Sequence, residues 1–182
     1  MANLCLLWHF HQPYYPDIQT NINSTSSITF RTLQNYYPMA KILQSFPDIR
    51  INFNITPTLL KQIKLTSEGE IKDLFLNIFQ DNTSISDLLF FYNELPKIFT
   101  SNNKTLNHLK EKVETGQYNK KDILDFKVHL HLICFNKILH TEEINYLIQK
   151  TRDFNQEDIE ILINKEKSIF SQVIPLYKKL QD

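Results

Sequence analysis

Two histidines and a glutamine near the N-terminus have the types and spacing to support chemistry. His9 and His11 are two residues apart and Gln12 follows directly, so an extended chain would present both imidazoles on one face. A neutral imidazole donates or accepts a hydrogen bond to a hydroxyl group of a ligand, and a pair on one strand face is also a common arrangement of two metal ligands. The pattern leaves both interpretations open.

Metal binding has less support from the rest of the chain. Zinc sites take three or four protein ligands, and no Asp, Cys or third His has a spacing that would bring it to His9 and His11. His129 and His131 do not share a helix face, and Asp125 with His129 is expected to be a surface pair. We therefore expect neither a metal nor another cofactor.

A short apolar strand over residues 4–10 is expected to position the two histidines. It is too short for a typical helix and is apolar on both faces near its start, which favours a central parallel strand covered on both sides. Pro13 ends the strand because proline has no N–H for the ladder. Parallel α/β sheets place ligand sites at the carboxyl ends of their strands, so His9, His11 and Gln12 are expected to line one.

A second strand is expected at residues 49–54, where apolar and polar side chains alternate. A polar loop at 17–29 and a helix at 38–46 separate it from the first strand, so the two should pair in parallel as a βαβ unit. The pair Thr56-Pro57 is typical of the start of another helix. Asn52 and Asn54 would then lie near the histidines.

Beyond residue 66 the sequence indicates helices and no further strand. The last helix is expected to begin at Asn155, with Asp158 completing a capping box, and to run to the C-terminus. Its apolar residues recur at three- and four-residue steps, so this face must be covered by something. The other expected helices span residues 71–79, 87–99 with a break at Pro96, 103–114, 119–140, and a segment that begins at Thr141.

Composition gives no sign of a partner chosen by charge. Lysine plus arginine and aspartate plus glutamate number 20 each, so no basic field would attract nucleic acid or an anionic membrane. No apolar run reaches the roughly 18 residues of a membrane-spanning helix, and no cationic leader is evident, so we expect a cytoplasmic location. Cys5 and Cys134 lie in apolar surroundings and are expected to be buried free thiols.

Several colinear blocks of the sequence resemble one enzyme family. Residues 8–15, Trp-His-Phe-His-Gln-Pro-Tyr-Tyr, look like the first signature of glycoside hydrolase family 57, the α-amylase, amylopullulanase and 4-α-glucanotransferase family. Residues 35–43, 46–50 and 52–60 follow in the order and approximate spacing of that family. Residues 174–182 resemble the helix that precedes its next strand.

The resemblance implies an α/β fold that contains the first two parallel strands of a seven-stranded β/α barrel, followed by a large, mostly α-helical segment. It implies a single partial domain over residues 1–182, with strand-helix-strand-helix at 1–65 and a helical insertion at 66–182. It also implies that His11 lines the subsite where the sugar is cleaved, with His9 and Gln12 beside it. The binding partner would be an α-glucan or maltooligosaccharide.

The resemblance further implies a glutamate nucleophile and an aspartate acid/base on later strands, and the sequence ends where the third strand would begin. We therefore expect an N-terminal fragment without catalytic residues, inactive unless a complementing C-terminal chain supplies the missing strands. Its own carboxylates, such as Asp17 and Asp48, are expected at the surface or in helix caps. The alternative is a non-catalytic helical protein that binds a partner, or itself, through the exposed face of its last helix.

Overall fold

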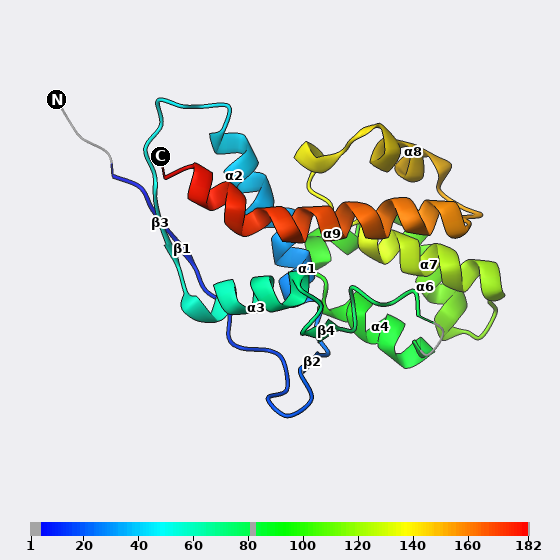
Figure 1. Ribbon diagram of the computed structural model, residues 1–182. Helices are drawn as coiled ribbons and strands as arrows, with labels where there is room; N and C mark the ends of the chain where they lie inside the picture. The colour runs from blue at the N-terminus through cyan, green and yellow to red at the C-terminus, as the bar shows by residue number, and fades with distance from the viewer. Residues whose placement is uncertain (1–4, 81–82, 182) are drawn as a thin grey trace.

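The computed structural model describes residues 5–80 and 83–181 as a mixed α/β fold that is mostly helical (Figure 1). Strand β1 (Leu7–Phe10) pairs in parallel with β3 (Asn52–Ile55), and His9 lies opposite Asn54 in the register. Helical segments connect the two strands, so the predicted parallel βαβ pair is confirmed. Leu4, where the predicted first strand begins, lies outside the described residues, as does the C-terminal residue.

Helices form most of the remaining chain. The first two, α1 (Ser27–Arg31) and α2 (Tyr37–Leu43), are joined by a π-helix, η1 (Thr32–Tyr36), into one segment. A second short parallel pair joins β2 (Ile22–Asn23) to β4 (Lys72–Asp73). The other described helices are α3 (Pro57–Ser67), α4 (Ile85–Glu94), α5 (Lys97–Thr100), α6 (Lys104–Glu114), α7 (Lys120–Leu132), the 3₁₀ turn η2 (Lys137–Leu139), α8 (Glu142–Lys150) and α9 (Gln156–Lys179).

Helix α9 crosses the molecule and organises its core (Figure 1). It begins with the predicted capping box, in which Asn155 Oδ1 accepts from Asp158 N at 3.0 Å and Asp158 Oδ2 accepts from Asn155 N at 2.8 Å. Its apolar stripe is buried against α2, α3, η1, α7 and α8. The apolar face of α9 is therefore not exposed, because the chain's own helices cover it.

The β1–β3 pair is covered on one face only, although the sequence predicted cover on both. Phe10 on the inner face is buried, whereas Leu7 on the outer face is 66% exposed and Cys5 is exposed rather than buried. The difference arises because α9 and η1 lie on a single side of the pair. Cys134 is buried as predicted, and burial together with the nearby Glu166 carboxylate raises the pKa of its thiol.

The segment at 71–79 is not the predicted helix. Leu74 N donates to Asn23 O at 2.8 Å, which continues the β2–β4 pairing, so a strand does occur beyond residue 66. Asp73 Oδ1 then accepts from Leu76 N at 2.8 Å. This local side-chain bond offers the backbone an alternative to helix and turns the chain.

Two other predicted boundaries are also wrong. The segment 17–29 contains β2 and the start of α1, so the helical segment begins at Ser27 and not near residue 38. The predicted helix at 119–140 ends at Leu132, and Asn136 caps the separate turn η2 by accepting from Ile138 N at 3.2 Å. The predicted break at Pro96 is confirmed, because α4 ends at Glu94 and α5 begins at Lys97.

Candidate functional site

Aromatic packing fixes the carboxyl end of β1 from beneath. The Phe10 ring lies 4.9 Å from that of Tyr36 and 5.5 Å from that of Phe53, measured between centroids. Tyr177 of α9 packs edge-on against Phe53, and its hydroxyl donates to Tyr36 O at 2.7 Å. Each such pair contributes about 1 kcal/mol beyond the burial of its area. The inner face of the strand is therefore held firmly to α9 and η1.

Two tyrosines hold the Gln12 amide in one orientation. Tyr15 Oη donates to Gln12 Oε1 at 2.6 Å, and Gln12 Nε2 donates to Tyr36 Oη at 3.0 Å. Burial raises the pKa of Tyr36, while the bond from Gln12 works in the opposite direction. An amide has two N–H donors and two acceptor lone pairs, so Gln12 keeps one of each for a ligand.

Helix α3 holds the turn that follows β1. The side chain of Gln62 is buried, and its Oε1 accepts from Tyr15 N at 3.0 Å while its Nε2 donates to Pro13 O at 2.9 Å. Thr58 Oγ1 donates to Gln12 O at 3.2 Å. The backbone on both sides of Gln12 is thus bound to the start of α3, which fixes the direction in which the strand end points.

His9 and His11 lie together on the open face of the strand. Both side chains are exposed, and their rings stack with centroids 5.9 Å apart and planes 20° from parallel. Within the described part of the chain neither imidazole has a hydrogen-bond partner, so backbone does not satisfy them. Asn54, the register partner of His9, is exposed beside them as predicted. Trp8 points to the opposite face, where it meets Phe53 edge-on.

Among residues 5–80 and 83–181, no group of three or more His, Cys, Asp or Glu is arranged to hold a metal ion. Hydroxyl and amide groups occur on this segment and its direct partners: Gln12, Thr58, which donates to Gln12 O, and Asn54, the register partner of His9. This donor and acceptor set suits hydroxyl groups of a neutral ligand better than a cation.

Asp125 and His129 are not the surface pair predicted from their spacing. Both are buried, with 4% and 5% of their surface exposed. Asp125 accepts from the backbone N–H groups of Asp153 and Phe154, and His129 Nε2 donates to Thr151 O at 2.7 Å. The segment after α8 therefore folds over both side chains, which sequence spacing could not reveal.

A buried ionisable pair lies in the core between α7 and α9. His131 Nδ1 and Glu166 Oε1 are 2.5 Å apart, and both side chains are fully buried. His131 Nε2 donates to Phe75 O at 2.9 Å, and the Phe75 ring stacks on the imidazole at 4.6 Å. Because Nε2 carries a proton, the His131–Glu166 contact shares one further proton. Glu166 Oε2 has no hydrogen-bond partner among the described residues.

Asp73 forms a second buried polar group next to this pair. Its Oδ2 accepts from Asn23 Nδ2 at 2.8 Å and from Thr29 Oγ1 at 3.4 Å. Burial raises the pKa of Asp73 to about 6, although these bonds and the charge of His131 lower it. No signal in the sequence indicated Asp73, because a helix was predicted at 71–79. Glu166, by contrast, could be recognised in the sequence as a charged residue within an apolar stripe.

No family model, curated protein or solved structure matches this chain at a significant level. Within the part of the chain that the structure describes, no helix is both long and apolar enough to cross a membrane.

Proposed function

We propose that this chain contributes an α-glucan-binding half-site of the glycoside hydrolase family 57 type. The observation that supports the proposal is that His9 and His11 stack on the open face of a parallel β strand and that Gln12, held by Tyr36, follows at its carboxyl end. Parallel strands deliver ligand-binding side chains at this end. A cytoplasmic location is part of the same proposal.

The chemistry at the strand end suits the hydroxyl groups of a sugar. The two imidazoles, which have no hydrogen-bond partner among the described residues, can each donate and accept, and the Gln12 amide retains one donor and one acceptor. Tyr15 and Tyr36 fix the Gln12 amide before a ligand arrives, so little entropy is lost in ordering it. This preorganisation favours Gln12 as a positioning contact and the histidines as adaptable ones.

Hydrolysis or transfer of a glucan would need two carboxyl groups about 5 to 5.5 Å apart for a retaining reaction. In the described residues, the hydrogen-bond partners of Gln12 are tyrosines and a threonine, and no carboxylate joins it or the two histidines. The β1–β3 pair has unpaired outer edges and an open outer face on which Leu7 is exposed. These edges suit pairing with further parallel strands that bring the carboxylates.

Self-association is the second candidate function, and one surface favours it. The residues around the β1–β3 pair leave a set of apolar side chains exposed, although α9 itself is covered. An unpaired strand edge beside apolar surface is a template for pairing with another chain. The exposed apolar residues of this region are Leu6, Leu7, Trp8, Phe46 and Ile49.

Isothermal titration calorimetry with maltoheptaose tests the proposed sugar binding. We expect weak saturable binding, with a Kd of about 1 mM, because a half-site makes few hydrogen bonds. His11→Ala should weaken it about five-fold or more, since a binding hydrogen bond contributes about 1 kcal/mol. Cellopentaose, whose linkage differs, should bind more weakly than maltoheptaose.

His108→Ala is the matched control, because His108 is exposed on α6, away from the β1–β3 pair (Figure 1). It should leave the affinity unchanged. Binding absent at about 20 mM sugar, or weakened equally by both substitutions, would contradict the proposal.

A further inference from the structure

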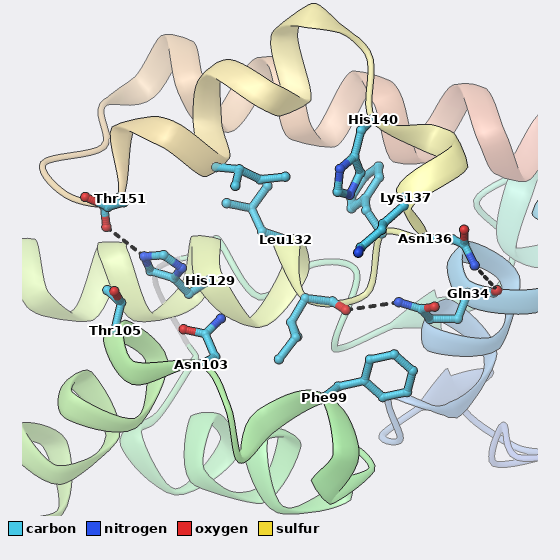
Figure 2. A pocket seen from close by; sticks show the side chains of 13 residues that line it. Gln34, Phe99, Asn103, Thr105, His129, Leu132, Asn136, Lys137, His140 and Thr151 are labelled. Carbon is cyan, nitrogen blue, oxygen red and sulfur yellow. Dashed lines mark hydrogen bonds between the residues drawn. The ribbon is translucent and has the colours of Figure 1, made fainter.

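A cavity of 580 Å³ lies in the helical part of the chain (Figure 2). Its walls come from the π-helix η1, the start of α6, the end of α7, the turn η2 and the end of α8. Small-molecule sites in proteins commonly have this size and combine apolar walls with a few polar groups. We therefore consider which ligand its side chains would accept.

Basic side chains line the cavity. Lys137 is among the described lining residues together with His129 and His140, and these residues include no aspartate or glutamate. Figure 2 shows the Lys137 ammonium directed toward the cavity with the His140 ring beside it. Lys137 is exposed, and its ammonium can form a charge-assisted hydrogen bond with an anionic group.

The N-terminus of α6 contributes positive potential at the other end of the cavity. Asn103 caps this helix of 11 residues by accepting from Leu106 N at 2.9 Å, and both Asn103 and Thr105 line the cavity. The first turn of α6 carries no acidic side chain, so its free N–H groups and dipole add positive potential.

The wall between these two ends is apolar. Phe99, Leu132 and Ile148 line it, and Ile148 lies at the rim with 37% of its surface exposed. A fully hydrated inorganic ion would gain nothing from this surface, whereas a ligand with a hydrocarbon or aromatic body would bury area there.

Hydrogen bonds fix the wall that joins η1 to α7. Gln34, a π-helical residue, donates from Nε2 to Ile133 O at 3.2 Å, and Asn136 Nδ2 donates to Gln34 O at 3.0 Å (Figure 2). Single π-helical turns are frequent at functional sites. Here the π-helix places a polar side chain at the cavity, and the two bonds hold that wall in place without a ligand.

We propose that this cavity binds a small organic anion, with its carboxylate or phosphate beside Lys137 and His140 and its apolar body against Phe99, Leu132 and Ile148. This site is separate from the strand end that carries His9 and His11. Its existence does not depend on the proposed sugar binding.

Titration calorimetry with three matched probes tests the proposal: 4-phenylbutyrate, phenyl phosphate and the neutral 4-phenylbutan-1-ol. We expect both anions to bind at least about ten-fold more tightly than the alcohol, which corresponds to one charge-assisted hydrogen bond. Equal binding of the anions and the alcohol, or no saturable binding by any of them, would overturn the assignment.

Three variants locate the binding. Lys137→Met should weaken both anions about five-fold or more and leave the alcohol unchanged, whereas Lys120→Met, which removes an exposed lysine at the opposite end of α7, should change neither. Ile148→Trp should block every probe by filling the rim. Circular dichroism confirms that each variant is folded. Unchanged binding in Ile148→Trp, or equal losses in the two lysine variants, would show that the anions bind elsewhere.

Discussion

Replacing Glu166 by methionine is expected to lower the free energy of unfolding by about 3 kcal/mol. The substitution leaves His131 fully buried with Nδ1 facing an apolar side chain, because no other described group is within hydrogen-bond reach of that nitrogen. Replacing His131 by phenylalanine should cost a similar amount, because the Glu166 carboxylate would then be buried without either of its oxygens bonded.

The double variant distinguishes a coupled pair from two independent residues. His131→Phe combined with Glu166→Met places an apolar pair of similar volume in the core, and we expect it to recover at least about 2 kcal/mol of the summed losses. Urea denaturation followed by circular dichroism measures each value. The exposed pair Lys64–Glu68, 3.8 Å apart, is the control and should show a coupling of about 0.5 kcal/mol or less. Additive losses at His131 and Glu166 would contradict the shared-proton contact.

The stability contributed by Asp73 is expected to fall as the pH rises. Burial raises its pKa from 3.8 to about 6 in the folded chain, so the folded state holds its proton more tightly than the unfolded state. The contribution is fully present below the unfolded value and is lost between about pH 4 and pH 6, with a total near 3 kcal/mol from roughly two pKa units.

Comparison with Asp73→Asn isolates this effect, because asparagine does not titrate. The variant loses the bonds that Asp73 Oδ2 accepts from Asn23 and Thr29, so it should be less stable at pH 4. Its deficit relative to the wild type should shrink as the pH rises to 7. Taking the difference in unfolding free energy between the variant and the wild type removes the contribution of His129, which both proteins share. Burial lowers the pKa of His129, so its contribution has the opposite trend and makes the fold more stable above about pH 6.5. A deficit independent of pH would contradict the raised pKa.

Local sequence patterns were sufficient to predict the strands and helix ends that interactions between nearby residues determine. The apolar run before His9 and the alternation before Asn54 predict the parallel pair, and the Asn155 and Asp158 spacing predicts the start of α9. The face of β1 that stays open was not predictable, because an apolar strand indicates two covered faces whether or not the chain supplies both covers.

The buried contacts depend on tertiary structure and leave little signal in the sequence. Glu166 lies 35 residues from His131, and no spacing rule connects them. The cavity proposed to bind an anion is harder to predict, because it depends on the contact between Gln34 and Ile133, which are 99 residues apart in the sequence. Gln34 lies in a π-helix, which no residue pattern in the sequence predicts. At the strand end, by contrast, His9, His11 and Gln12 were predictable because they belong to one continuous segment.

The most direct test of the central claim is a map of where maltoheptaose binds, obtained from the imidazole and backbone amide NMR shifts of the intact chain. We expect saturable shifts in the His9 and His11 rings and in the side-chain amide of Gln12, with His108 and His140 unmoved. Shifts confined to residues of the helical cavity, or no saturable shift at the end of β1, would contradict an α-glucan site there.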